Sequence, residues 1–414
     1  MEEVSRKPAY AFVLPRYFSG IAGGAETLAG SLARDLAKRG CAVEIFTTCA
    51  KDNRTWENFF PAGKSIEEGV TVRRFRVDDR NLDIWIPKQI AISQGMRLSV
   101  DDQLDWMREG VNSTALYEEI LRRESEFEKI FFAPYLFSTT FWGSLMLTEK
   151  AVLIPCLHDE NYAYLDVIAS MFRQVKGCLF NSLPEKELAY SLYGEISGGE
   201  VGMGFEAFSE EYLLSLKNNF EIDSPYLLYI GRKETGKNVQ LLIDYFIYAK
   251  DYCKVNPALK LVIAGGGDFK DLHRESALTR NDIVDIAHLT ENDKHALMKG
   301  ALIFCQPSLN ESFSIVIMES WLLGVPCLVH GDCAVTSYHV SQSGGGLYFT
   351  NEREFSEVLR LISHEKDLVL QMGCSGADYV KRQYSWDAVF CRFQKALECI
   401  AKDSNISQVN LENL

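Results

Sequence analysis

Short apolar runs recur along the chain, and stretches with helical periodicity separate them. The runs predict strands at Tyr10–Leu14, Val43–Thr48, Lys129–Ala133, Ala151–Leu157, Gly177–Asn181, Tyr226–Ile230, Leu261–Ala264, Ile283–Ile286, Leu302–Gln306 and Pro326–His330. Alternation of this kind is typical of parallel sheets that helices cover on both faces. A glycine-rich and then polar stretch between Val201 and Ser224 divides the runs into two series. The pattern therefore predicts an α/β fold with two doubly wound parallel sheets.

The length indicates how these two series are organised. The chain has 414 residues, whereas single hydrophobic cores stop growing at roughly 250–300 residues. We therefore expect two domains, residues 1–215 and 216–385, with one cleft between them.

Composition and charge exclude some classes of function. The formal net charge is −14, from 43 basic and 57 acidic residues, which argues against a protein that binds nucleic acid by general attraction to phosphates. The 11 cysteines form no C-x-x-C pair, which favours buried thiols in a reducing compartment. The apolar stretch before Pro15 is too short for a signal peptide. We therefore expect a cytoplasmic protein.

One uncharged segment, Ile130 to Thr148, approaches the length that spans a bilayer. It contains Pro134 and Gly143, and a second apolar run begins at Ala151. This spacing favours a strand, a loop and a helix of a buried parallel sheet over a transmembrane helix.

A glycine-rich loop follows the first predicted strand. It contains Gly23 and Gly24 and leads into a helix with Leu28, Leu32 and Leu36 on one face. Glycines at the start of a helix let the backbone approach a phosphate or a sugar and direct amide groups at it. The spacing is not G-x-G-x-x-G, so a tight turn without a ligand is an equal alternative.

Two cations follow the strand Tyr226–Ile230. Arg232 and Lys237 lie on the loop at its carboxyl end, where ligands collect in open α/β sheets. Such a pair suits a diphosphate whose negative charge grows as a phosphate ester leaves. Taken alone, the pair would be better explained by a solvated basic loop.

Two carboxylates follow the strand Leu302–Gln306. Glu311 lies in the next loop, and Glu319 lies about one turn into an apolar helix. The amides from Phe313 to Val316, including those of Ser314 and Ile315, would form the start of that helix, where anions bind. An unpaired charge at Glu319 would be costly, so we expect it to bind hydroxyl donors or, alternatively, to pair with an arginine.

Taken together, these segments resemble a known family. The resemblance spans nearly the whole chain and rests on GGAETLAGSLARDLAKRG, LHDENYAYLDVIASMFRQVKGCLFNS, YIGRKETGKN, LVIAGGGD, QPSLNESFSIVIMESWLLGVPCLV and YSWDAVFCRFQKAL. The family is retaining glycosyltransferase family four, which consists of nucleotide-sugar-dependent enzymes with the GT-B fold. That fold implies two Rossmann-like domains facing each other across a cleft, with the last helix, 386–404, packing back onto the first domain.

The resemblance implies roles for residues of the second domain. Arg232 and Lys237 are expected to bind the donor diphosphate and to stabilise the departing nucleotide. Glu319 is expected to accept hydrogen bonds from the nucleotide ribose, and Glu311 to lie beside hydroxyls of the donor sugar. The backbone amides of Phe313, Ser314, Ile315 and Val316 are expected to hold the phosphate or the sugar.

The first domain is expected to complete the site. Gly23 and Gly24 match the glycine loop that faces the diphosphate and the acceptor. His158 matches the histidine that lies beside the transferred sugar, and it directly follows a predicted strand. A histidine that is merely a satisfied polar group is the alternative.

Several positions depart from the usual pattern of this family. Ser314 replaces the frequent glycine after Phe313, and Asn238 stands where glycine often follows the lysine. No D-x-D motif occurs in the sequence. The cations Arg232 and Lys237 are therefore expected to replace a metal ion, and we expect metal-independent activity without a cofactor.

The resemblance predicts transfer of a hexosyl group from a nucleoside diphosphate sugar to an acceptor hydroxyl, in cell-surface polysaccharide, glycolipid or glycoconjugate synthesis. The acceptor would be a glycan, a glycolipid or a small molecule. A nucleotide-sugar epimerase of the same fold and a non-catalytic sugar-nucleotide-binding protein remain alternatives.

Basic residues gather in two further places. They lie at Arg73, Arg74, Arg76, Arg122 and Arg123, which would allow peripheral contact with anionic lipid at the inner face of the membrane if the residues share one face. A solvated surface is the favoured interpretation. The long insert from Lys51 to Gly110 is expected to shape the acceptor side.

Overall fold

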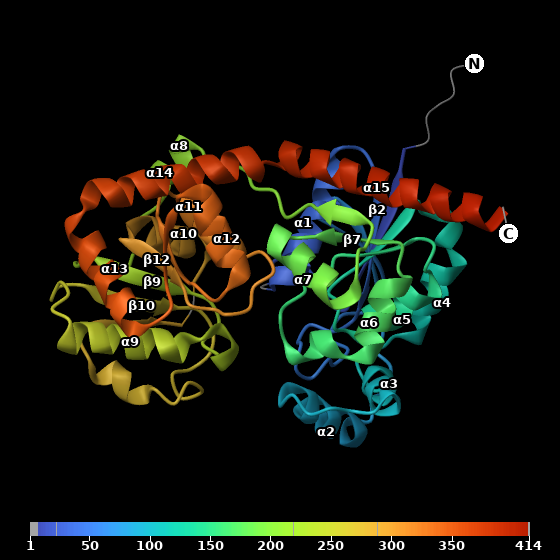
Figure 1. Cartoon of the computed structure of the whole chain (residues 1–414), viewed down its shortest axis with the longest axis horizontal. Coiled ribbons are helices and arrows are strands. Elements are labelled where there is room, and N and C mark those ends of the chain that lie inside the picture. Colours follow the sequence, from blue (N-terminus) through green and yellow to red (C-terminus); the bar gives the residue numbers. More distant parts are fainter. Residues whose placement is uncertain (1–6, 22, 218, 288, 413–414) are drawn as a thin grey trace, which may run out of the picture. The chain divides into compact units, whose positions relative to one another are not determined.

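The computed structural model describes residues 7–21, 23–217, 219–287 and 289–412, with side chains to residue 402. The contacts divide the chain into two compact units (Figure 1). One comprises Met1–Gly204 and Trp386–Leu414, and the other comprises Phe205–Ser385. The first unit therefore ends at Gly204 rather than near residue 215. The reason is that Tyr212 packs on α10 of the second unit, where its hydroxyl lies 2.7 Å from Nδ1 of His295.

The first unit contains an eight-stranded sheet in the order β3-β4-β2-β1-β5-β6-β7-β8. The strands are β1 (Ala9–Leu14), β2 (Ala42–Thr48), β3 (Gly63–Glu67), β4 (Val70–Phe75), β5 (Lys129–Phe132), β6 (Ala151–Leu153), β7 (Gly177–Phe180) and β8 (Gly198–Glu200). All neighbouring pairs are parallel except β3 and β4. The predicted strand at 151–157 ends early, because Pro155 lacks an amide donor and Cys156 has a φ of 52°.

Helices cover this sheet. They are α1 (Gly24–Lys38), α2 (Leu82–Ser93), α3 (Val100–Arg108), α4 (Thr114–Arg122), α5 (Ser138–Met146), α6 (Asp166–Gln174), α7 (Leu183–Tyr193) and α15 (Trp386–Glu412). The predicted apolar face of α1, with Leu28, Leu32 and Leu36, is buried. The helix α15 packs against β8, where Ala396 lies over Gly199, and Arg392 donates to the carbonyl of Val201. The C-terminal helix is therefore part of the first unit.

The second unit contains a six-stranded, wholly parallel sheet in the order β11-β10-β9-β12-β13-β14. The strands are β9 (Tyr226–Ile230), β10 (Lys260–Ala264), β11 (Ile283–Ile286), β12 (Ile303–Gln306), β13 (Cys327–His330) and β14 (Gly346–Phe349). The helices are α8 (Glu210–Ser215), α9 (Val239–Tyr252), α10 (Glu291–Gly300), α11 (Ile315–Leu322), α12 (Ala334–Ser343), α13 (Glu352–His364) and α14 (Lys366–Gln383). The predicted class, α/β with two parallel sheets, is confirmed.

The uncharged segment from Ile130 to Thr148 forms most of β5, a connecting loop and α5, as its spacing predicts. Across the described residues, every helix is too short or too polar to cross a bilayer.

Candidate active site

The second sheet changes its direction of growth between β9 and β12. The strands β10 and β11 lie on one side of β9, and β12, β13 and β14 lie on the other. Ligands bind at the carboxyl ends of parallel strands at such a switch point. The loop after β9 carries Arg232 and Lys237, and the loop after β12 carries Glu311. The topology therefore brings these two loops to one edge of the sheet.

Lys237 and Glu311 form an ion pair at this edge. The Nζ of Lys237 donates to Oε1 of Glu311 at 2.7 Å. Gln306, the last residue of β12, donates to the same oxygen through Nε2, also at 2.7 Å. The Lys237 and Glu311 side chains are 28% and 12% exposed. Their attraction is therefore less screened than that of a pair on open surface.

Arg232 and Lys233, which begin the loop that carries Lys237, differ sharply in burial. Arg232 keeps 59% of its side chain exposed and pairs with Glu234 at 3.0 Å. Lys233 has no exposed side-chain surface, and its ammonium pairs with Asp285 of β11 at 2.8 Å. The same ammonium donates to the carbonyl of Gly265 at 2.5 Å. A buried ammonium is stable only when it is paired in this way, so Lys233 fixes the loop that carries Arg232.

Two residues of the site adopt a left-handed backbone conformation. Asn238 precedes α9 with a φ of 58°, and Ser314 precedes α11 with a φ of 67°. These are the two positions at which the family pattern has glycine, which adopts such angles without strain. Asparagine tolerates them better than serine does. In addition, Asn238 donates to the carbonyl of Pro307 at 3.1 Å.

The start of α11 is held by aromatic packing. Phe313 is 2% exposed, and its ring stacks on that of Phe205 with centroids 6.2 Å apart. The ring of Tyr384 meets Phe313 edge-on at 5.1 Å. The first amides of α11, including those of Ile315 and Val316, have no acceptor within the helix and carry its positive dipole end. This turn can therefore bind an anionic group.

Glu319 lies further along α11 and pairs with a lysine rather than with an arginine. Its Oε1 accepts a hydrogen bond from Nζ of Lys294 at 2.9 Å. Burial raises the pKa of Glu319, and the ammonium of Lys294 opposes that rise. The expectation that this buried carboxylate requires a partner is therefore met by a residue of α10 that the sequence did not indicate.

The two glycines of the loop in the first unit differ in the space around them. A Cβ atom at Gly23 would lie 2.2 Å from Oε2 of Glu26, whereas one at Gly24 would meet nothing within 4 Å. Glu26 is held by Arg16, which donates to its Oε1 from Nη2 at 2.8 Å and from Nε at 3.0 Å. The carboxylate of Glu26 therefore lies close against the backbone of Gly23, whereas the space beside Gly24, at the start of α1, holds no other atom of the described chain.

His158 lies in the loop after β6, and contacts of its side chain and of the preceding residue hold it in place. Its Nδ1 lies 3.6 Å from Oε1 of Glu160, and that oxygen accepts a hydrogen bond from the hydroxyl of Tyr135 at 2.8 Å. The amide of the preceding residue, Leu157, donates to Oε1 of Glu185 at 2.6 Å. Glu185 is fully buried, and burial raises its pKa to about 8. These contacts position the backbone that carries His158.

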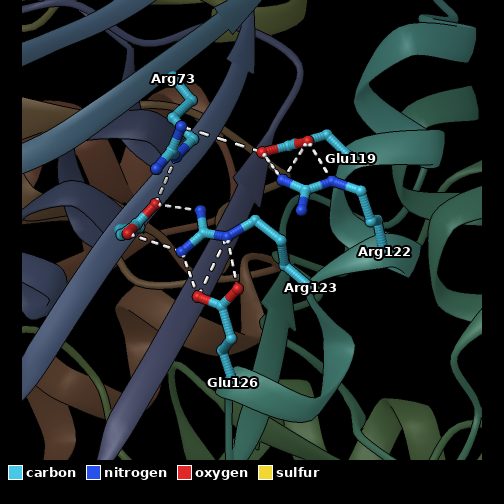
Figure 2. A network of polar contacts seen from close by, with 6 residues as sticks. Arg73, Glu119, Arg122, Arg123 and Glu126 are labelled. Atoms are coloured by element: carbon cyan, nitrogen blue, oxygen red, sulfur yellow. Dashed lines mark hydrogen bonds and ion pairs between the residues drawn. The ribbon is translucent and has the colours of Figure 1, made fainter.

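Four of the arginines at residues 73–76 and 122–123 form ion pairs, and Figure 2 shows three of them, Arg73, Arg122 and Arg123. Arg123 pairs with Glu44 at 2.6 Å and with Glu126 at 2.5 Å. Arg73 pairs with the same Glu44 at 2.5 Å. Arg73 also lies 3.9 Å from Glu119, which pairs with Arg122 at 2.8 Å, and Arg74, which is 7% exposed, pairs with Glu67 at 2.6 Å. Contact of these arginines with anionic lipid stays a prediction.

The structure thus brings Lys237 and Glu311 together and places the start of α11 a few residues beyond Glu311. Gly23, Gly24 and His158 belong to the first unit. Sequence reasoning missed the supporting residues Gln306, Lys233 and Lys294. Of these three residues, only Lys233 carries a signal in the sequence, because it is a lysine that closely follows the apolar strand Tyr226–Ile230.

Comparison with known proteins agrees with this geometry. Residues 214–377 match the family described as "Glycosyl transferases group 1". The alpha-monoglucosyldiacylglycerol synthase of Streptococcus pneumoniae is 23% identical, over 95% of this chain and 88% of its own length. An uncharacterized glycosyltransferase of Methanocaldococcus jannaschii is also 23% identical, over 77% of this chain and 79% of its own length.

Solved structures share the fold over nearly the whole chain. Sucrose-phosphate synthase from Thermosynechococcus elongatus has a TM-score of 0.68 at 15% identity, over 97% of this chain and 100% of its own. Anabaena HepE, solved in complex with UDP and glucose, has a TM-score of 0.68 at 14% identity, over 95% of this chain and 100% of its own. These matches define the class of protein as a glycosyltransferase with the GT-B fold. The match to the group 1 glycosyl transferases lies in the second unit, and together with the curated relatives it supports a glycosyltransferase of the family-four type.

Proposed function

We propose that this protein transfers a hexosyl group from a nucleoside diphosphate sugar to an acceptor hydroxyl with retention of anomeric configuration. The observation that carries the proposal is the Lys237–Glu311 pair, 2.7 Å long, at the switch point of the second sheet. Structures similar in fold were solved with UDP and glucose and with UDP-2-fluoro glucose. The same edge here offers cations for a diphosphate and a carboxylate for sugar hydroxyls.

The residues divide the chemistry between them. Lys237 and Arg232 would neutralise the diphosphate as the bond from the anomeric carbon to the phosphate oxygen breaks. The amides at the start of α11 add positive dipole charge. Glu311 would accept hydrogen bonds from the transferred sugar, and Glu319 from the nucleotide ribose. The acceptor oxygen forms its bond on the same face of the sugar, and its proton passes to the leaving phosphate oxygen.

An exposed apolar surface on the first unit favours a lipid acceptor over the other acceptor classes. We define the α2 patch as three side chains of α2 that are 44–49% exposed and spaced four residues apart, on one face of the helix, namely Leu82, Ile86 and Ile90. Helices that lie in a membrane interface bury such residues in the lipid. The relative from Streptococcus pneumoniae is named for a glucosylated diacylglycerol. We therefore propose a glycolipid or a lipid precursor as the acceptor.

Product analysis tests the reaction. Incubation with a panel of nucleotide sugars, followed by separation of the products, should show one sugar transferred to a diacylglycerol lipid with its anomeric configuration kept. Release of an isomerised nucleotide sugar or of a free sugar isomer without any acceptor would show an epimerase instead. Donor binding without turnover, across the panel and with lipid, glycan and small-molecule acceptors, would show a non-catalytic binding protein.

Vesicle flotation tests the lipid surface separately. The wild-type protein should bind phosphatidylcholine vesicles, and a double variant of the α2 patch, Ile86→Glu with Ile90→Glu, should bind at least about tenfold less, because charges replace two exposed apolar side chains that would enter the lipid. Leu370→Glu is the matched control, since Leu370 is 64% exposed on the second unit. Equal binding of all three proteins would contradict a role for α2.

A further inference from the structure

A buried ammonium group lies between two carboxylates on the second unit. Nζ of Lys294 lies 2.7 Å from Oε2 of Glu291 and 2.9 Å from Oε1 of Glu319. Only 15% of the Lys294 side chain is exposed, and 16% of that of Glu319, whereas Glu291 is 78% exposed. We call Lys294 and Glu319 the inner pair. Because both of its charges are largely removed from water, loss of either partner would be costly.

Each member of the inner pair keeps the other charged. Burial raises the pKa of Glu319, and Lys294 lowers it through its charge and its hydrogen bond. Burial also acts to lower the pKa of Lys294, but Glu319 and Glu291 raise it overall. Removal of the ammonium would leave a buried carboxylate without compensation, and such a group tends to take up a proton.

The pair uses only one oxygen of Glu319. Its Oε1 receives the bond from Lys294. Its Oε2 is buried and has no hydrogen-bond partner within the described part of the chain. A buried carboxylate oxygen without a donor is costly in a resting protein, and it is explained if a ligand supplies the donor.

We infer that Lys294 is a positioning residue, which fixes one oxygen of Glu319 and keeps it negatively charged so that the other oxygen can accept hydrogen bonds from a diol of the donor nucleotide. This inference rests on the proposed function. It gives a reason for the position of Lys294 and assigns a role that neither the family match nor the sequence pattern indicated.

A metal ion is the competing explanation. Glu291, His295 and Glu319 bring three potential ligand atoms within 4.8 Å of one another. However, the ammonium of Lys294 already contacts both carboxylates, so an ion would have to displace it. His295 adds no charge near neutral pH, because burial lowers its pKa to about 4. Lys294 and Glu291 are therefore the described charged groups that act on Glu319.

Nucleotide binding as a function of pH tests the inference. UDP, GDP and ADP are titrated into the wild-type protein by calorimetry, and the tightest of them serves as the probe. For Lys294→Met, which keeps the length of the side chain without its charge, the ratio of variant to wild-type Kd should rise about tenfold for each pH unit below the new pKa of Glu319. The ratio should approach one at high pH, and Lys294→Arg should keep it near one throughout.

Lys250→Met is the matched control. Lys250 is also buried, at 8% side-chain exposure, and lies 3.8 Å from Asp282. Asp282 directly precedes β11, so this pair lies at the edge of the sheet opposite the site. The control should lower stability without a pH-dependent change in Kd. A ratio for Lys294→Met that is the same at pH 6 and pH 9 would overturn the inference.

The proposed function has its own readout in the same experiment. The 2′-deoxy form of the probe should bind the wild-type protein more weakly than the probe itself, and Glu319→Gln should remove most of that difference. If Glu319→Gln binds the probe as the wild type does, or if no nucleotide binds the wild type, the proposed role of the site fails. If Glu319 matters and Lys294→Met has no pH-dependent effect, only the role of Lys294 fails.

Discussion

Lys237 and Glu311 are 74 positions apart in the chain, yet Nζ of Lys237 donates to Oε1 of Glu311 at 2.7 Å. The contact exists because β9 and β12 are neighbours in the sheet, although β10 and β11 lie between them in sequence. The cation that we propose for the diphosphate and the carboxylate that we propose for the sugar are thereby held in one place. Each side chain also fixes the orientation of the other.

We expect Lys237→Met to reduce kcat by about 10²–10³, because loss of one charge-stabilising contact of this kind costs on the order of 2.7–4 kcal/mol. Donor turnover, measured under saturating donor and acceptor, gives the value. Lys366→Met is the control, because Lys366 is exposed at the start of α14. The fold should be intact in both variants by circular dichroism. A rate within about threefold of wild type for Lys237→Met would remove Lys237 from the mechanism.

Glu311→Gln separates a sugar contact from a purely supporting role. The amide keeps the size of the side chain but loses the charge that Lys237 and Gln306 now share. We expect kcat to fall by at least about tenfold, because hydrogen bonds to a charged acceptor are roughly twice as strong as neutral ones. If instead only thermal stability falls and kcat is unchanged, Glu311 merely holds Lys237 in place.

Ser314→Gly should stabilise the protein by about 1 kcal/mol, since a left-handed backbone costs a non-glycine residue roughly 1–2 kcal/mol. Ser314 has a φ of 67°, and its buried hydroxyl has no acceptor among the described residues. The same substitution at Ser363, within α13, should instead destabilise by about 0.5 kcal/mol. Chemical denaturation measures both values. Destabilisation by Ser314→Gly would mean that the serine hydroxyl contributes more than the strain costs.

The sequence predicted the strands well where they are buried on both faces. The strand β9 has the predicted bounds, and β10, β12 and β13 differ by one residue at an end. The strands β3, β4, β8 and β14 escaped prediction because they are short or carry glycine and charge, for example Gly198 and Gly199 in β8 and Arg73 and Arg74 in β4. The boundary between the units was placed too late because α8 looks like a polar linker. Only its packing on His295 shows where it belongs.

The site was predictable in its charges but not in their support. Arg232, Lys237 and Glu311 stand out because they lie in loops that directly follow predicted strands, and Glu319 stands out because it interrupts an apolar helix. Lys294 does not stand out, because it lies in a polar helix where any lysine would be read as a solvated residue. Its role depends on the packing of α10 against α11, which is a property of the tertiary fold.

Activity should persist without divalent metal. The positive charge at the diphosphate edge is supplied by Arg232 and Lys237, and that beside Glu319 is supplied by Lys294. We expect the rate of transfer in excess chelator to stay within about twofold of the untreated rate. The reason is that these side-chain cations would supply the positive charge that a metal ion otherwise provides. Complete loss of activity that magnesium restores would contradict this expectation and would point to an ion bound with the donor.

Glu44 should make the first unit sensitive to acid. Burial alone would raise the pKa of Glu44, but Arg123 and Arg73 lower it to about 2. Because the pKa is lower in the folded state than the ordinary value of 4.5, this carboxylate stabilises the fold above pH 4.5. That stabilisation is lost as the pH falls from 4.5 towards 2.

Glu44→Gln should therefore destabilise the protein at neutral pH by about 3 kcal/mol, since it leaves a buried arginine without one of its partners. Arg123 is only 9% exposed in its side chain. The difference from wild type should shrink as the pH falls from 4.5 towards 2, because the carboxylate of the unfolded wild-type chain takes up a proton there before that of the folded chain does. Glu357→Gln is the control, since its pair with Arg360 is more than half exposed on both sides and solvent should screen it almost completely. A difference between Glu44→Gln and wild type that stays constant from pH 7 to pH 3, measured by urea unfolding, would show that the network acts by packing rather than by charge.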